Sequence, residues 1–247
     1  MSHNPSLPLR GETVLLTRPR RSSTKLRDQL IQMGASVIHI PTVELVPLEP
    51  TIEGIWDKPY CALAFSSQNA WSFFLELLEK NNMELPSAFP RFSIGPATTE
   101  VMRQFGPAIQ ADTRSGHGLA QAVWNHFGTT PSPHPVLFPC SKHAHVSFSE
   151  TLQNLGMQSE RLEIYEPRPC EPGPIPLEVS RPSWVILTSP SAILGYVEHL
   201  HPIERAKIVC MGPTTKAAAE KAGLHVDLVP DQPGTEDLIQ AILKARG

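Results

Sequence analysis

Five segments of the sequence combine hydroxyl-bearing residues with glycine or proline, a composition that suits the binding of anions. Each follows a short apolar run and precedes a helical pattern, so its hydroxyls and backbone N–H groups would lie at the start of a helix. The segments are TRPRRSST at 17–24, FSSQNA at 65–70, IGPATT at 94–99, LTSPSA at 187–192 and MGPTTK at 211–216. Helix capping alone would also favour Ser and Thr in such turns.

A run of basic residues overlaps the first turn and is consistent with an anionic ligand. It consists of Arg18, Arg20, Arg21, Lys25 and Arg27. A solvated helix face would explain these cations equally well. The recurrence of the turns favours a ligand with several carboxylates or phosphates, held between two domains.

The signatures of several large enzyme classes do not occur in the sequence. There is no GxGxxG, Walker loop, HExxH or GxSxG motif, which argues against a nicotinamide dehydrogenase, a P-loop enzyme, a zincin and an α/β hydrolase. Cys140, His143 and His145 form a C-x-x-H-x-H cluster without an evident fourth ligand. We expect a solvated loop there and no metal, with a metal-dependent hydrolase as a weaker alternative.

Short apolar runs alternate with amphipathic stretches along the chain. The predicted strands are 14–17, 37–40, 61–65, 92–94, 136–138, 162–165, 184–188, 207–211 and 226–229. Apolar runs without polar alternation are typical of strands that are buried on both faces. Helices are predicted between them, the first capped by Ser22 or Ser23 and ended by Gly34. This alternation predicts an α/β fold with parallel sheets flanked by helices.

An internal repeat indicates two similar domains. Three pairs of landmarks are each 122 residues apart: Val14 and Val136, Gly34 and Gly156, Ser67 and Ser189. Further along, IGPATT at 94–99 matches MGPTTK at 211–216 at an offset of 117. A constant offset over several landmarks is typical of a duplicated α/β unit.

Prolines mark the connections between these copies. The chain has 26 prolines in 247 residues, about twice the usual ~5%. Their clusters are Pro41, Pro47, Pro50 and Pro59; Pro131, Pro133 and Pro135; and Pro167, Pro169, Pro172, Pro174 and Pro176. Clusters at equivalent points of the two copies suggest that the chain crosses twice between domains, although two sequential domains would also fit.

Composition limits the function further. With 40% hydrophobic residues and a net charge of −3, a globular protein is expected and a strongly basic nucleic-acid binder is not. No apolar run approaches the ~20 residues of a membrane helix, and the first ten residues do not form a secretory signal. Four scattered cysteines favour a reducing cytoplasm. Without sustained heptads, we expect a monomer.

Taken in order, these segments resemble the uroporphyrinogen-III synthase family. The resemblance covers about residues 12–245 and includes VLLTRP, FSSQNA, IGPATT, YEP, LTSPSA, MGPTTK and a late T-x-x-L. It implies two similar α/β domains joined by a two-stranded β linker. The first domain would comprise 1–38 plus 175–247 and the second 46–163, with linkers at 39–45 and 164–174.

The resemblance also implies an activity in tetrapyrrole (heme) biosynthesis. The linear tetrapyrrole hydroxymethylbilane would be cyclised to uroporphyrinogen III, with loss of water and inversion of the last pyrrole ring. No cofactor, metal, nucleic acid or membrane is expected, and the preceding pathway enzyme is a candidate for transient contact. The alternative is a non-catalytic two-domain module that binds an anionic tetrapyrrole or another anionic small molecule.

The family's functional residues carry over onto matching positions of this sequence. Tyr165 is the candidate acid that protonates the leaving hydroxyl, with a packed linker tyrosine as the alternative. The predicted substrate-binding residues are Thr17, Arg18, Ser66, Ser67, Gly95, Pro96, Thr98, Ser189, Gly212, Pro213, Thr214 and Thr215. One segment departs from the family, because a turn that usually contains Gly and Arg is PCSKHAHVSF at 139–148 here. Lys142 or the histidines are candidate substitutes.

Overall fold

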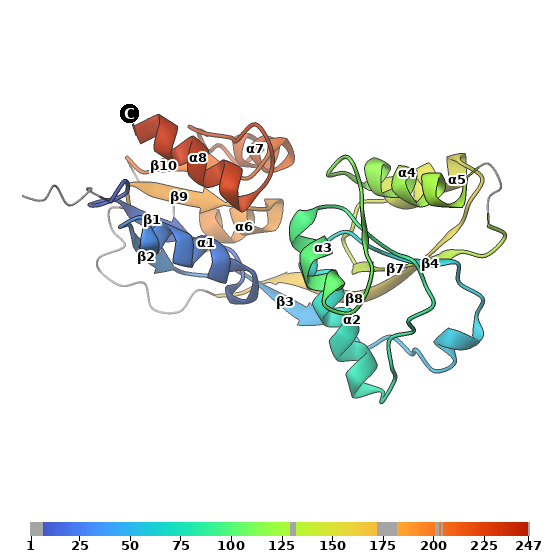
Figure 1. Ribbon diagram of the computed structural model, residues 1–247. Coiled ribbons are helices and arrows are strands. Elements are labelled where there is room, and N and C mark those ends of the chain that lie inside the picture. Colours follow the sequence, from blue (N-terminus) through green and yellow to red (C-terminus); the bar gives the residue numbers. More distant parts are fainter. Residues whose placement is uncertain (1–6, 129–131, 172–181, 201–202, 204, 247) are drawn as a thin grey trace, which may run out of the picture. The chain divides into compact units, whose positions relative to one another are not determined.

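The computed structural model describes residues 7–128, 132–171, 182–200, 203 and 205–246. The chain divides into two compact units (Figure 1), of which unit 1 is Met1–Leu45 with Pro167–Gly247 and unit 2 is Val46–Glu166. The predictions for Pro131, Pro172, Pro174, Pro176 and the boundary at residue 175 lie outside the described residues. The predicted domain bounds stay a prediction.

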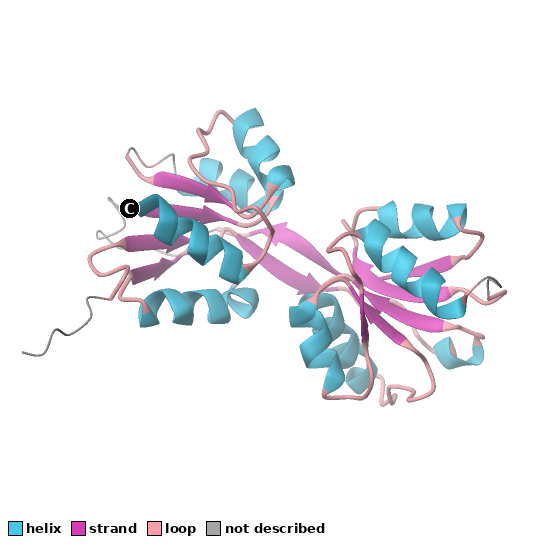
Figure 2. Ribbon diagram, turned by 45° about the horizontal axis from the view of Figure 1, so that its top comes forward, coloured by secondary structure: helices cyan, strands magenta, loops and turns pink. Residues whose placement is uncertain are grey.

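Unit 1 contains a parallel sheet with the strand order β10-β9-β1-β2. Its strands are β1 (Thr13–Leu16), β2 (Ser36–His39), β9 (Trp184–Leu187) and β10 (Lys207–Cys210). Its helices are α1 (Arg20–Gln32), α6 (Pro190–Gly195), the π-helical turn η3 (Tyr196–Leu200), α7 (Pro213–Lys221) and α8 (Thr235–Arg246). Helices flank the strands on both sides (Figure 2).

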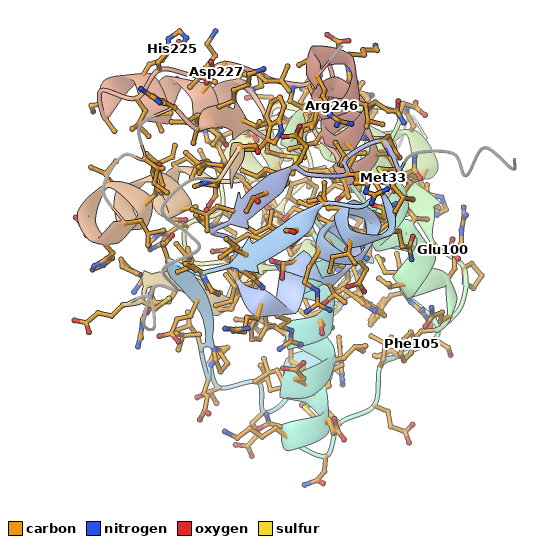
Figure 3. The ribbon with its side chains drawn as sticks, turned by 90° about the vertical axis from the view of Figure 1, so that its left-hand side faces the viewer. Met33, Glu100, Phe105, His225, Asp227 and Arg246 are labelled. Carbon is orange, nitrogen blue, oxygen red and sulfur yellow. The ribbon has the colours of Figure 1, made fainter. Side chains whose placement is uncertain are left out.

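The central strands β1 and β9 of unit 1 are buried on both faces, as their uninterrupted apolar runs predict, whereas β2 at the edge of the sheet has no fully buried residue. Val14 and Leu16 pack with residues of α1 and α8 in one core cluster. Leu15, which points to the opposite face, packs with residues of α6 and α7 in the other. At the end of α8, Arg246 donates to the Glu12 carboxylate and the Arg10 carbonyl, each at 3.1 Å, and so ties this helix to the segment before β1 (Figure 3).

The second sheet has the order β3-β8-β7-β4-β5-β6. Its strands are β3 (Val43–Pro47), β4 (Ala62–Phe65), β5 (Arg91–Ser93), β6 (Ile109–Gln110), β7 (Val136–Ser141) and β8 (Ser159–Pro169). Unit 2 also contains the 3₁₀ turn η1 (Ile55–Asp57) and the helices α2 (Gln68–Lys80), α3 (Pro96–Arg103), α4 (Gly116–Phe127) and α5 (Ser147–Asn154). Strands β3 and β8 extend past the unit boundaries and carry the chain from one unit to the other.

The two units repeat one topology. The pairings of β1 with β2 and β9, and of β9 with β10, match those of β7 with β8 and β4, and of β4 with β5. Gly34 and Gly156 end the equivalent helices with positive φ angles of 93° and 80°, which glycine adopts at little cost. The prediction of parallel α/β sheets flanked by helices is confirmed.

Some local predictions are wrong. Residues 226–229 do not form a strand, because only Leu228 forms a bridge, to Val209. The Asp227 carboxylate accepts the Ile208 N–H at 2.7 Å and so takes the place of a ladder bond. Helix α1 begins at Arg20 after Pro19, not at a serine cap. The Ser23 hydroxyl instead donates to the Arg20 carbonyl inside the first turn.

The described helices include none that is long and apolar enough to cross a lipid bilayer.

Candidate functional site

Each sheet has one point where the strand order reverses. In unit 1 the chain passes from β1 to β2 in one direction and from β9 to β10 in the other, so the reversal lies between β1 and β9. In unit 2 the reversal lies between β7 and β4. Ligands of open parallel sheets bind outside the carboxyl ends of the strands at such points. The turns after β1, β9, β7 and β4 are therefore the candidate sites.

The turn after β1 is built around a buried hydroxyl and a half-buried arginine. Thr17 is fully buried and donates its hydroxyl to the Ile186 carbonyl at 3.2 Å, which locks this turn to β9 beside it. For Arg18, burial lowers the pKa, and its Nε has no hydrogen-bond partner among the described residues. The turn leads into α1, which has no side-chain cap.

A histidine that the sequence analysis did not select fixes the same turn. The Nε2 atom of His39, at the end of β2, is 2.8 Å from the Arg18 carbonyl, and Nδ1 is 3.4 Å from the Ser23 hydroxyl. Burial lowers the pKa of His39, the hydrogen bond to the Arg18 carbonyl opposes this shift, and the charges of Arg20 and Arg27 add to it. A neutral imidazole with its proton on Nε2 therefore donates to Arg18. The sequence feature that could have pointed to His39 as a site residue was its place near the end of a predicted strand.

In unit 2 the structure brings two predicted residues together. Ser67 caps α2 by accepting the Ala70 N–H at 3.1 Å, and the same oxygen is 3.4 Å from the Tyr165 hydroxyl. Tyr165 lies within β8, is 8% exposed, and stacks on Phe73 with ring centroids 4.9 Å apart. Burial raises the pKa of Tyr165, and the contact with Ser67 opposes this shift. Ser66 precedes the cap and is half-buried.

Ser189 is the counterpart of Ser67 in unit 1. It caps α6 by accepting the Ala192 N–H at 3.3 Å. Its hydroxyl also lies 3.0 Å from that of Ser191. The structure thus gives both copies the same serine cap after the strand at the reversal point.

The glycine–proline turns are also equivalent in the two copies. Gly95 and Gly212 have extended backbones and precede α3 and α7, in which Pro96 and Pro213 are the first residues. Thr98 and Thr215 are both 5% exposed, whereas Thr214 is exposed. Of these three threonines, Thr214 is therefore the one that a ligand can reach from solvent without a change in the turn.

The C-x-x-H-x-H cluster does not converge on one point. Cys140 is fully buried in the core of unit 2, and burial raises its pKa to about 11. His143 and His145 are exposed on the following loop. Over the described part of the chain, no three His, Cys, Asp or Glu side chains are grouped as a metal site requires.

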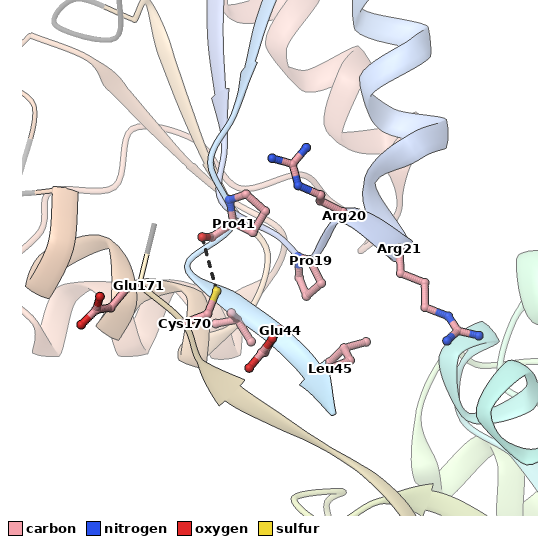
Figure 4. A pocket seen from close by; sticks show the side chains of 9 residues that line it. Pro19, Arg20, Arg21, Pro41, Glu44, Leu45, Cys170 and Glu171 are labelled. Carbon is pink, nitrogen blue, oxygen red and sulfur yellow. Dashed lines mark hydrogen bonds between the residues drawn. The ribbon is translucent and has the colours of Figure 1, made fainter. Parts of the chain in front are cut away.

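A pocket of about 440 Å³ opens in unit 1 beside the start of α1 (Figure 4). It is lined by Pro19, Arg20, Arg21, Pro41, Val43, Glu44, Leu45, Cys170 and Glu171. The Cys170 thiol donates to the Pro41 carbonyl at 3.5 Å, and burial raises its pKa. Among the lining residues, the sequence had drawn attention to the two arginines of the basic run, to Pro19 in the first turn and to Pro41 in a proline cluster. Val43, Glu44 and Leu45 come from β3, and Cys170 and Glu171 directly follow β8.

A protein-family model described as uroporphyrinogen-III synthase HemD matches residues 24–240. The chain belongs to the uroporphyrinogen-III synthase family. The match includes four of the five predicted turns completely and only the last residue, Thr24, of the first.

Curated relatives agree with this assignment. A porphyrin biosynthesis protein HemD of Ruminiclostridium josui is 22% identical over 97% of this chain and 50% of its own length. A uroporphyrinogen-III synthase of Chlorobaculum parvum is 25% identical over 95% of this chain and 99% of its own. The chain thus spans half of the first relative and nearly all of the second.

Solved structures of the family share the fold. A uroporphyrinogen-III synthetase from Helicobacter pylori has a TM-score of 0.62 at 17% identity and covers 95% of this chain and 100% of its own. A mutant uroporphyrinogen III synthase from Thermus thermophilus has a TM-score of 0.58 at 12% identity, over 95% and 98% of the two chains. At these identities the likeness supports the fold.

Proposed function

We propose that this member of the uroporphyrinogen-III synthase family cyclises hydroxymethylbilane to uroporphyrinogen III, with loss of water and inversion of the last pyrrole ring. The family match over residues 24–240 carries the proposal. The two serine-capped turns at the reversal points support it, because they place hydroxyls where parallel sheets bind ligands.

The polar turns are proposed to bind the substrate's carboxylates. Each pyrrole of hydroxymethylbilane carries an acetate and a propionate, and hydroxyls, backbone N–H groups and arginine are suitable donors to carboxylates. The proposed binding residues are Thr17, Arg18, Ser66, Ser67, Gly95, Pro96, Thr98, Ser189, Gly212, Pro213, Thr214 and Thr215. The buried threonines among them would act mainly by holding the turns in shape.

Tyr165 is proposed to protonate the leaving hydroxyl. The phenol proton passes to the terminal hydroxyl of the substrate, the C–O bond breaks, and water leaves while the pyrrole electrons stabilise the carbon left behind. Ring closure with inversion follows, and the proton that the closing ring loses returns to the phenolate. The raised pKa keeps Tyr165 protonated at neutral pH, so the acid is present in its active form.

The enzyme has to form isomer III faster than the spontaneous reaction proceeds, since hydroxymethylbilane also closes without a catalyst to the isomer without inversion. A hundredfold preference for isomer III needs about 2.7 kcal/mol of differential transition-state stabilisation. Holding the reacting ends of the linear substrate in place could supply that amount, and a positioned acid contributes roughly 10²–10⁴-fold.

A product-isomer assay tests the proposal. Purified protein receives freshly generated hydroxymethylbilane, and the porphyrins are oxidised and separated by chromatography. We expect mainly isomer III, formed faster than isomer I forms in a control without protein. Mainly isomer I at the control rate would contradict a synthase and favour the non-catalytic binding module.

We further propose a monomer in the cytoplasm that contacts the preceding pathway enzyme transiently. The four cysteines support a reducing compartment, because all of them are free thiols. Size-exclusion chromatography with light scattering would test the oligomeric state.

A further inference from the structure

The loop after β7 lies at the reversal point of unit 2 and departs from the pattern of the family. Strand β7 pairs with β8 from Val136 to Ser141, and the register shifts between Cys140 and Ser141. Such irregularities are frequent beside active sites, where they re-aim a side chain. The shift brings the end of β7 to the level of Tyr165 on β8, so the next residue, Lys142, lies near the candidate acid.

Lys142 is fixed at its backbone and at its ammonium group. Its N–H donates to the Tyr165 carbonyl at 2.9 Å. Its Nζ lies 3.1 Å from a carboxylate oxygen of Glu166, the residue that follows Tyr165. The Glu166 side chain is 12% exposed and that of Lys142 is 52% exposed. A ligand approaching from solvent therefore meets the cation, while the carboxylate that holds it is turned into the protein.

We propose that Lys142 binds a carboxylate of the substrate and that Glu166 positions it for this role. The inference rests on the proposed function. An ammonium group carries three donors, so the ion pair with Glu166 leaves donors for a ligand. At the same end of the sheet the hydroxyls of Ser67 and Tyr165 are 3.4 Å apart. Lys142 would thus anchor the substrate at the same end of the sheet as the acid, where the family usually has a turn with Gly and Arg.

A second ion pair in unit 2 provides a matched control. Lys58 lies 2.7 Å from a carboxylate oxygen of Glu160, which is on the same strand as Glu166. The Lys58 side chain is 57% exposed, close to the value for Lys142. Glu160 pairs with Leu137 near the start of β7, however, whereas Lys142 follows its end. The two lysines occupy opposite ends of the sheet, and the carboxylate beside Lys58 is more exposed, at 37% against 12% for Glu166.

The test compares Lys142→Gln with Lys58→Gln in the full-length protein. We expect Lys142→Gln to raise the KM for hydroxymethylbilane about tenfold, as the loss of a hydrogen bond between charged groups predicts, with kcat within a factor of about two. Lys142→Arg should restore most of the affinity, because the charge is kept. Glu166→Gln should raise KM by a smaller factor, and Lys58→Gln should leave it unchanged.

A binding assay separates this inference from the proposed function. Binding of the octacarboxylate uroporphyrin III, measured by its fluorescence, should weaken by a similar factor in Lys142→Gln and become less sensitive to salt. An unchanged KM and unchanged uroporphyrin affinity in Lys142→Gln would overturn the role of Lys142. If the wild type produced no isomer III while Lys142→Gln still bound uroporphyrin more weakly, the synthase would fail and the carboxylate site would stand. Melting temperatures of all variants show whether each one folds.

Discussion

At the scale of single residues, Tyr165 is the group whose removal should cost the most activity. Tyr165→Phe keeps the ring that stacks on Phe73 and removes the hydroxyl beside Ser67. We expect the rate of isomer III formation to fall by roughly 10²-fold or more, since a general acid contributes about that much. The free energy of unfolding should fall by only about 1 kcal/mol, the net contribution of one hydrogen bond. Steady-state rates and denaturant titrations measure the two effects.

Tyr196→Phe is the control for this prediction. The Tyr196 hydroxyl is also buried and accepts the Ile203 N–H at 3.0 Å. This variant should lose similar stability and keep its rate. Because burial raises the pKa of Tyr165, wild-type activity should show no loss from tyrosine ionisation up to about pH 10, the ordinary phenol pKa. A Tyr165→Phe rate equal to that of the wild type would remove Tyr165 as the acid.

The sequence predicted which turns are polar but not which hydroxyls are accessible. Thr17 and Thr214 were selected on the same grounds, yet Thr17 is fully buried and Thr214 is exposed. The direction of a side chain at a strand end depends on the neighbouring strand, here the Ile186 carbonyl of β9 that accepts the Thr17 hydroxyl. His39 was missed for a similar reason, because its partners Arg18 and Ser23 come from another element.

At the scale of elements, Gly195 allows helix α6 to approach the segment after β2. A Cβ atom at Gly195 would lie 2.5 Å from the Thr42 Cβ and 2.7 Å from the Thr42 carbonyl oxygen. Thr42 is itself held, since its hydroxyl donates to the Ala192 carbonyl at 3.2 Å. Gly195→Ala should therefore lower the free energy of unfolding by about 1–3 kcal/mol, the usual cost of overpacking. Chemical denaturation measures the change.

Leu194→Ala is the control in the same helix. Leu194 is 57% exposed, so its truncation should change stability by no more than about 0.5 kcal/mol. Equal stability of Gly195→Ala and the wild type would mean that α6 can shift away from Thr42 without loss.

Strands with a continuous apolar run were predicted well, whereas strands that are held in place mainly by pairing with a neighbouring strand were not. Strands β1, β4 and β9 are buried on both faces and begin or end within one residue of their predicted ranges. Strand β3 was not predicted, because its residues Val43–Pro47 mix polar and apolar side chains without a clear period. Strand β6 is two residues long and exposed. Its place in the sheet comes from its pairing with β5.

At the scale of the whole molecule, the sequence revealed the duplication but not how the copies share their strands. The offset of 122 residues made β1 the equivalent of β7, and β4 the equivalent of β9, in the two copies. In the structure β1 pairs with β9 and β7 with β4, so each sheet joins strands from both copies. A pattern of apolar residues defines where a strand is, whereas its neighbour is decided by packing. The pattern alone therefore left two sequential domains open, and the first domain made of two segments was implied by the family resemblance.

Because each sheet joins strands from both copies, unit 2 should fold without the rest of the chain, whereas a single copy should not. Unit 2 is one continuous stretch, Val46–Glu166, and its core cluster from Ala62 to Met157 lies wholly inside that stretch. A fragment of residues 43–169, which adds the rest of β3 and β8, should therefore fold alone. We expect a cooperative urea transition with an m-value about half that of the full chain, because m scales with the surface exposed on unfolding. Dispersed amide resonances should accompany it.

Unit 1 consists of two distant segments, so residues 1–45 alone should stay unfolded and serve as the control. A fragment 43–169 without a cooperative transition would show that the fold of unit 2 depends on the rest of the chain.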